Sequence, residues 1–493
     1  MQHVTCQLNL NYRISRTVVL INLSDALDTK KWVDSSRNNQ ASYDPSQKKT
    51  SIYVMEMEEK KKSVQEFQDD YDPYDHRVVT HPTTFAETLL HLLKGSLGTG
   101  ILAMPSAFHN SGYAVGTVAT IIIGMFCTYC MRILVNSEYE LCKRKKVPSL
   151  SYHGTAEAAL SVGPVPLRRF AKPSIHVINV FLLVYQLGTC CVYTVFIGTN
   201  LEKALNDYLP NMDVRLYMVA ILVPLILVNW IRNLKFLAPC STIANFITLA
   251  SFSIILYYIF REPLSLEDRE PIGHVTNFPL YFGTVLFALE AIGVVMPLEN
   301  EMKKPKKFMS LFGVLNVGMS TIVVLYTVIG LFGYIRYGSE VGGSITLKLG
   351  EHEILGQSVQ LLLSLAIFFT HPIQCYVAID IVWNEYIAPK LEKNSRKLLW
   401  EYVLRTSIVL STFLLAIVIP ELELFISLFG ALCLSGLGLI FPAIIQICTF
   451  WGVSTRTERA IMLAKNMSLI LFGLLGLIVG TYTSLRNIVR KFS

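Results

Sequence analysis

His91-Leu92-Leu93-Lys94-Gly95-Ser96-Leu97-Gly98-Thr99-Gly100-Ile101-Leu102-Ala103-Met104-Pro105 is apolar enough to enter a bilayer, yet it carries three glycines, a threonine and two basic residues. Hydrocarbon holds no water that could hydrogen-bond to free backbone groups, so a spanning helix is normally continuous. Non-helical backbone at membrane depth is tolerated where protein buries it or where it lines a watery cavity. The stretch therefore predicts a spanning helix that breaks at a binding site.

The composition indicates an all-α, multi-pass membrane protein. The chain has 493 residues, of which 52% are hydrophobic and 16% charged, with a mean hydropathy of +0.45; soluble domains carry about 25% charged residues. We expect the lipid bilayer as a partner, with no enzyme activity, no nucleic acid, no metal and no cofactor. Since a spanning helix needs about 20 apolar residues, eleven spans are predicted at 85–108, 113–135, 174–199, 214–231, 237–260, 278–299, 308–334, 355–382, 400–419, 422–450 and 463–485.

Positive charge is concentrated in alternate loops. The connections from even to odd spans carry Lys143, Arg144, Lys145, Lys146, Arg168, Arg169 and Lys172, then Lys303, Lys304, Lys306 and Lys307, then Lys390, Lys393, Arg396 and Lys397. The positive-inside rule places these loops and the amino terminus in the cytosol, and the carboxyl terminus outside or in a lumen. Arg486, Arg490 and Lys491 near the carboxyl terminus go against this pattern.

The chain divides into a tail and two related halves. Residues 1–82 are polar and predict a disordered cytosolic tail, followed by five-helix repeats at 83–260 and 278–450 and an accessory helix at 463–485. Many transporters consist of two inverted halves whose first helices are both broken. Here the segments 98–105 and 290–297 each carry small or polar residues followed by Met-Pro. This repeated pattern predicts a second break in span 6.

The first break predicts a carboxylate site. Where span 1 unwinds, the amides of residues 96–101 lose helical partners, and the second half-helix presents its positive end to the cavity. The predicted substrate contacts are Ser96, Leu97, Gly98, Thr99 and Gly100. The alternative is that the glycines only allow close helix packing.

The second break supplies the ammonium end of the predicted site, at Phe287, Ala288 and Glu290. A carboxylate in the membrane costs several kcal/mol unless it is partnered or protonated. Glu290 could therefore hold the ammonium group, carry a proton, or lock the broken helix by bonding to backbone amides.

His91 is the candidate proton-coupling residue, with Glu290 assisting, because an unperturbed imidazole titrates near pH 6.5. It shares a helix face with Glu87 and Lys94. A histidine packed in the bundle is the alternative, while Thr84 and Glu87 form a capping-box pattern and Lys94 could extend towards the surface.

Other polar groups in or near the spans favour packing or surface pairing over ligand contact. Glu299 and Glu301 are expected to pair with lysines at the surface, and Cys127 with Cys130 to pack. His352 and Glu353 lack a second histidine at metal spacing. The membrane residues in this class are Tyr185, Gln186, Tyr193, Thr370, His371 and Gln374.

The segments 91–105, 282–300, 231–234 and 343–347 together resemble the proton-coupled amino acid transporters of the animal amino acid/auxin permease superfamily, over roughly residues 80–485. The loops are similar to those of insect members. The resemblance implies eleven spans in the five-plus-five inverted-repeat, bacterial leucine transporter-like fold of the amino acid-polyamine-organocation group. It also implies glycine, alanine or proline as substrates, H⁺ symport, and a proton-responsive histidine at His91. Tyr129 stands where relatives can have a histidine, and the outer loops lack the cysteines that relatives can pair.

We therefore predict a secondary active transporter of small neutral amino acids that works by alternating access with H⁺ as the coupling ion. A sodium-coupled carrier is one rival, although span 8 lacks an adjacent Ser/Thr pair at mid-depth. The other is an amino acid sensor that signals through its tail to a partner with little flux, as insect members of the resembled family include such forms. The plasma membrane and the lysosomal or late endosomal membrane remain equal expectations.

Overall fold

The computed structural model describes residues 71–79, 81–209, 212–232, 238–289, 291–350, 353–392 and 395–492. Most of the expected tail, residues 1–70, lies outside the described residues. Within these ranges the secondary structure is helical, apart from an isolated bridge between Thr83 and Met302. The all-α prediction is confirmed for this part of the chain.

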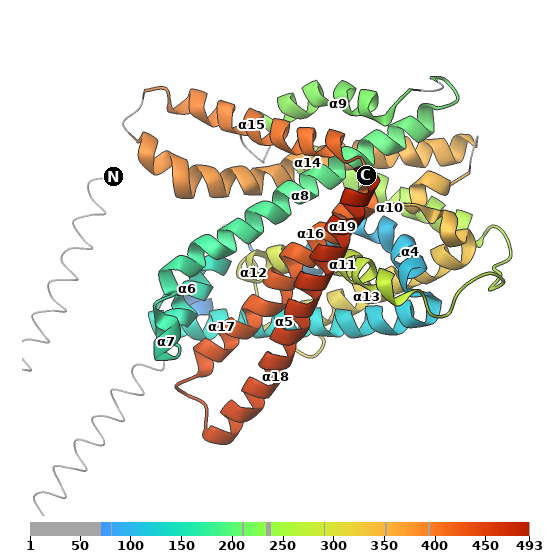
Figure 1. Cartoon of the computed structure of the whole chain (residues 1–493). Helices are drawn as coiled ribbons and strands as arrows, with labels where there is room; N and C mark the ends of the chain where they lie inside the picture. The colour runs from blue at the N-terminus through green and yellow to red at the C-terminus, as the bar shows by residue number, and fades with distance from the viewer. Residues whose placement is uncertain are drawn as a thin grey trace, which may run out of the picture. The chain divides into compact units, whose positions relative to one another are not determined.

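The helices follow the predicted order (Figure 1). Helix α6 with the short α7 is an addition, since no span was predicted between residues 135 and 174. The bounds are α3 (Phe85–Ser96), α4 (Thr99–Ser111), α5 (Tyr113–Lys145), α6 (Tyr152–Val162), α7 (Val165–Arg168), α8 (Ala171–Leu205), α9 (Val214–Asn229), α10 (Ala238–Phe260), α11 (Phe278–Ala288), α12 (Ile292–Asn300), α13 (Val314–Tyr337), α14 (Ile354–Asp380), α15 (Lys397–Val418), α16 (Leu422–Phe429), α17 (Phe441–Phe450), α18 (Arg456–Leu475) and α19 (Thr481–Phe492).

Nine helices in the described part of the chain are long and apolar enough to cross a membrane. They match nine of the predicted spans. The other two predictions correspond to α9, an apolar helix of 16 residues, and to the pair α3 and α4, which is interrupted as expected. Several helices extend beyond their predicted ends, as α5 does by reaching Lys145.

Helix α4 lies at the centre of the packing. Every one of its residues except His109 is buried, and its neighbours include α11 and α13. By contrast, α18 and α19 form a long peripheral helix, drawn in red in Figure 1. Only 17% of its most apolar stretch is buried inside the protein. The accessory role of the last helix stays a prediction.

Helix α11 packs unusually closely on the tenth predicted span, which consists of α16, the π-helical segment Gly430–Ile440 and α17. A Cβ atom at Gly430 would lie 1.9 Å from the Gly283 carbonyl oxygen, and one at Gly283 would lie 2.2 Å from the Ser427 carbonyl oxygen. Small residues permit such approaches between membrane helices. Glycine is therefore required on both sides of this contact.

The expected boundary of the tail at residue 82 lies too late in the sequence. Residues 71–79 contain a single 3-10 turn, Pro73–His76, whose amino end is capped by the Asp72 side chain. The carboxylate of Asp72 accepts a hydrogen bond from the Tyr74 amide at 3.1 Å. Polar composition predicted disorder here, but the segment obtains its order from distant parts of the chain.

Candidate substrate site

The break in the first span consists of two residues. The Leu97 amide still donates to the Leu93 carbonyl at 2.9 Å, and the Gly98 amide donates to the Ser96 carbonyl at 2.9 Å. Gly98 is extended, with φ −118° and ψ −153°, and α4 begins at Thr99 without a side-chain cap. The first amides of α4 are those of Thr99, Gly100 and Ile101, so the opening is shorter than the predicted stretch 96–101.

The second predicted break separates α11 from α12. Helix α11 ends at Ala288, the Leu289 amide closes its last turn on the Val285 carbonyl at 2.9 Å, and α12 begins at Ile292. Glu290 lies outside the described residues, so its predicted roles stay predictions. The amino end of α12, like that of α4, has no side-chain cap.

The two breaks lie against each other. A Cβ atom at Gly100 would lie 2.6 Å from the Cα of Ala288 and 3.1 Å from its Cβ. One turn earlier, a Cβ atom at Gly95 would lie 3.3 Å from the Val294 side chain. Gly100 and Ala288, predicted separately as contacts for opposite ends of a substrate, are therefore neighbours.

Helix α8 brings two tyrosines to the breaks. The Tyr193 hydroxyl lies 3.6 Å from where a Gly98 Cβ would stand, and the Tyr185 ring lies 6.1 Å from the Phe287 ring. Both tyrosines are buried. From the sequence alone these residues favoured packing, whereas the fold places them where a ligand at the breaks would meet them.

Three buried polar atoms near this region have no hydrogen-bond partner among the residues that the structure describes: Thr99 Oγ1, Thr284 Oγ1 and Gln186 Oε1. Leaving such a group without a partner costs about 1–3 kcal/mol. A polar ligand or water at the breaks would remove that cost. The amino end of α4 suits a carboxylate, and the unpaired hydroxyl and amide oxygens can accept hydrogen bonds from an ammonium group. Together they suit a small zwitterion.

Tyr326 of α13 is a residue that the sequence analysis missed. It is fully buried, and its hydroxyl donates to the Ser96 carbonyl at the last turn of α3. The two residues are 230 positions apart, so no local pattern could have paired them. Tyr326 thus fixes the backbone on one side of the first break.

Tyr326→Phe is expected to reduce uptake of amino acids about tenfold, because the Ser96 carbonyl keeps its bond from the Gly98 amide but loses the second one, worth about 0.5–1.5 kcal/mol, and the break loses its fixed geometry. Uptake per unit of protein in liposomes measures this effect. Tyr334→Phe is the matched control at the other end of α13, where the hydroxyl accepts from the Glu270 amide at 3.2 Å. Equal uptake by Tyr326→Phe and the unsubstituted protein would contradict the assignment.

His91 lies on an exposed face of α3, together with Glu87 and Lys94. The shared face is as predicted, and Thr84 with Glu87 forms the expected capping box. His91 lies two helical turns before Gly98, so the rest of α3 separates it from the first break.

The remaining candidates pack between helices. Thr370 bonds within α14 to the Ala366 carbonyl at 2.8 Å, and the fully buried His371 contacts Asn229 of α9 through Nδ1 at 3.3 Å. Cys127 and Cys130 are buried, and no group of metal-binding side chains occurs within the described residues. The packing interpretation fits each of these positions.

The expectation for Glu299 is wrong. Its side chain is buried, and it pairs with Arg77 at 2.8 Å instead of a surface lysine. Glu301 is exposed, and its carbonyl accepts from the Thr83 amide at 2.9 Å. The lysines beside Glu299 suggested a local pair, whereas the actual partner comes from the segment assigned to the tail.

Comparisons with known proteins identify what the chain is similar to. The model of a family described as "Transmembrane amino acid transporter protein" matches residues 81–486. The chain is 41% identical to the proton-coupled amino acid transporter-like protein pathetic of Drosophila melanogaster, over 86% of this chain and 89% of that protein. It is 27% identical to the probable amino acid transporter skat-1 of Caenorhabditis elegans, over 83% of this chain and 91% of that protein.

A solved structure, the inward-facing conformation of Mhp1, is similar in fold. Its TM-score is 0.54 at 13% identity, and the alignment covers 85% of this chain and 92% of that one. At this identity the likeness concerns the fold alone.

Proposed function

Because the chain belongs to the family of transmembrane amino acid transporter proteins, we propose that it carries small neutral amino acids of the glycine, alanine and proline class in symport with H⁺. It is a multi-pass membrane transporter and not an enzyme. The observation that carries the proposal is the contact between Gly100 and Ala288, which brings the amino end of α4 against the carboxyl end of α11 in one site.

The charge and size of the site support this substrate class. Among the predicted contacts Ser96, Leu97, Gly98, Thr99 and Gly100, the last two offer the first amides of α4 to a carboxylate. All five residues carry no charge, as is true of Phe287 and Ala288. A substrate with a charged side chain would have to bury that charge, which is costly without a partner. The rings of Tyr185 and Phe287 limit the space for a side chain.

Proton coupling rests on His91 and on the name of the Drosophila relative. In this proposal H⁺ is the coupling ion, no cofactor is required, and Glu290 assists. The broken helices belong to two inverted repeats within eleven spans, and transport proceeds by alternating access around the breaks. The loop charges support an amino terminus in the cytosol and a carboxyl terminus outside or in a lumen.

Uptake by the full-length protein in liposomes tests the proposal. Labelled glycine, alanine and proline are offered at about pH 5.5 outside and about pH 7.5 inside, on either side of the ordinary histidine pKa, without Na⁺. We expect uptake that a protonophore abolishes. A strict requirement for Na⁺ would replace symport with H⁺ by a sodium-coupled mechanism, and binding without uptake would identify a sensor.

His91→Ala is expected to remove most of the increase in uptake between about pH 7.5 and about pH 5.5, a range centred on the ordinary histidine pKa, because this proposal assigns proton coupling to His91. The same substitution at His109, the exposed histidine at the far end of α4, is the control and should leave the pH profile unchanged. Initial rates measured across this range report the profile. An unaltered profile in His91→Ala would remove His91 from the mechanism.

A further inference from the structure

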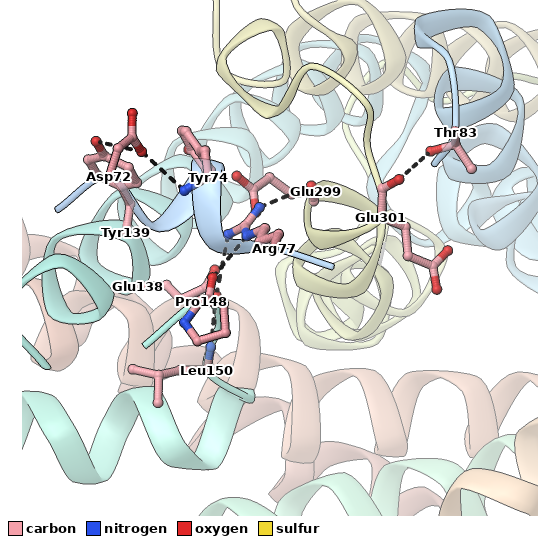
Figure 2. Close-up of polar contacts among 10 residues, drawn as sticks. All are labelled: Asp72, Tyr74, Arg77, Thr83, Glu138, Tyr139, Pro148, Leu150, Glu299 and Glu301. Atoms are coloured by element: carbon pink, nitrogen blue, oxygen red, sulfur yellow. Dashed lines mark hydrogen bonds and ion pairs between the residues drawn. The ribbon is translucent and has the colours of Figure 1, made fainter. Parts of the chain in front are cut away.

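A buried charge cluster lies where the chain enters the bundle, away from the substrate breaks. Figure 2 shows Arg77, which follows the turn Pro73–His76, directed towards Glu299 of α12 and Glu138 of α5. The side chain of Arg77 is 6% exposed, and those of the two glutamates are each 1% exposed. Neither the substrate site nor the proton-coupling residue uses this cluster.

Arg77 connects three parts of the chain. Its Nη1 lies 2.8 Å from Glu299 Oε2 and donates to the Glu299 carbonyl at 3.3 Å. Its Nε donates to the Pro148 carbonyl at 3.0 Å, and its Nη2 lies 4.0 Å from Glu138 Oε1. The guanidinium also stacks over the Tyr74 ring at 4.7 Å. Residues 71–79 are therefore tied to α12, to α5 and to the connection after α5.

The charges in this cluster make Arg77 hard to replace. One guanidinium faces two buried carboxylates, and Glu138 receives a further hydrogen bond from the Leu150 amide at 3.1 Å. Removing the cation from a buried pair leaves an uncompensated charge, which is strongly unfavourable unless water enters. Release of Arg77 should therefore be accompanied by hydration of Glu138 and Glu299.

Helix α12 in turn is attached to α3. The Thr83 amide donates to the Glu301 carbonyl at 2.9 Å, and the Lys303 amide donates to the Thr83 carbonyl at 2.9 Å. The contact of Gly95 with Val294 joins the same two helices nearer the breaks. The half-helices α3 and α12 are thus held as a pair, and Arg77 fastens this pair to α5.

A weaker anchor lies at the rim. Asp72 pairs with Lys306 at 2.8 Å and accepts from the Tyr139 hydroxyl at 3.4 Å. Burial raises the pKa of Asp72, but its bonds to Lys306 and to the Tyr74 amide outweigh this and lower the pKa below its usual value. The Asp72 carboxylate therefore stays ionised, and keeps its attraction for Lys306, to a lower pH than an isolated aspartate would.

We propose that residues 71–79 form a latch and that Arg77 is a gating residue of the transport cycle. With Arg77 between Glu138 and Glu299, the half-helices α3 and α12 are held against α5 and the end of the bundle where the chain enters is closed. Withdrawal of Arg77 frees this pair, admits water from the cytosol and allows substrate to leave. The role in substrate release rests on the transport function proposed above, whereas the opening of the latch can be measured without substrate.

Cys142 provides a native reporter. It is fully buried and follows Glu138 by one helical turn, so both residues share a face of α5. In inside-out membranes holding the full-length protein with Cys6→Ser and Cys240→Ser, a charged maleimide should label Cys142 slowly, and Cys142→Ser should abolish that labelling. Arg77→Gln should accelerate labelling at least about tenfold. Losing the buried cation destabilises the closed state, and the fraction of open molecules should rise by a similar factor. Arg77→Lys should restore much of the protection.

Controls separate the latch from a general loss of folding. Lys304→Gln, at an exposed lysine after α12, should not change labelling. If Arg77→Gln does not reach the membrane, Asp72→Ala is measured in its place, because it removes the Asp72–Lys306 pair and leaves the buried charges intact. We expect about threefold faster labelling for Asp72→Ala, with Asp75→Ala, exposed in the same turn, as its matched control.

Unchanged labelling in Arg77→Gln, or in Asp72→Ala where the first variant is not obtained, would overturn the latch. That outcome is distinguishable from a failure of the proposed function, because labelling requires no amino acid and no proton gradient. Faster labelling in a protein that transports no amino acid would retain the latch and reject the transport proposal.

Discussion

Gly100→Ala is expected to reduce uptake of amino acids at least about a hundredfold while the protein still reaches the membrane. The new methyl group would lie 2.6 Å from the Cα of Ala288, a distance at which backbone and not a flexible side chain must move. Overpacking of this kind costs about 1–3 kcal/mol, and here it separates the two helix ends that form the site. Displacement of catalytic or binding groups by about 1 Å can cost about a hundredfold in rate.

Gly95→Ala is the matched control for Gly100→Ala. Its methyl group would meet the end of the Val294 side chain at 3.3 Å, which can adjust by rotation, so uptake should fall less than about threefold. Initial rates of alanine uptake, normalised to protein in the liposomes, distinguish the two variants. Equal rates in both would mean that the contact with Ala288 is not needed for transport.

Gly430→Ala is expected to prevent accumulation of folded protein. Its methyl group would lie 1.9 Å from the Gly283 carbonyl oxygen, so α11 and the π-helical segment Gly430–Ile440 would have to separate. Since α11 carries one side of the substrate site, its displacement affects stability and transport together. The loss in free energy of unfolding should exceed about 3 kcal/mol, the upper end of the usual cost of overpacking.

Gly438→Ala, eight positions later in the same π-helical segment, is the control for Gly430→Ala. A Cβ atom at Gly438 meets nothing within 4 Å, so this variant should retain the yield and the thermal midpoint of the unsubstituted protein in detergent. Size-exclusion profiles and thermal unfolding measure both properties. A stable, monodisperse Gly430→Ala protein would contradict the close packing of α11 on this segment.

The breaks could be predicted from sequence because their cause is local. Glycine and proline interrupt apolar runs within a few residues, and the echo of Gly98–Pro105 in the later segment 290–297 pointed to the second break. The length of the first opening could not be predicted. Whether Ile101 continues a helix depends on how α4 packs against α11 and α13, which is decided by tertiary contacts.

Partners far apart in the sequence could not be predicted either, because tertiary contacts bring them together. The Arg77 and Glu299 pair spans 222 positions, so the lysines near Glu299 offered the simpler local interpretation. Tyr185 and Tyr193 were recognised as polar groups in a membrane helix, but only the course of α8 places them at the breaks. Composition likewise assigned residues 71–79 to the tail, since a polar segment gives no sign of the distant carboxylates and lysine that its side chains pair with.

The burial of α4 has a consequence for how the protein responds to its bilayer. Because every residue of this helix except His109 is enclosed by protein, acyl chains do not touch its first amides, to which we assign the substrate carboxylate. A change in bilayer thickness acts on helices at the lipid boundary, which tilt or kink to relieve the mismatch, and the exposed α18 and α19 are of this kind. The substrate site is thereby insulated, so lipids of different chain length should alter the rate of conformational exchange more than substrate affinity.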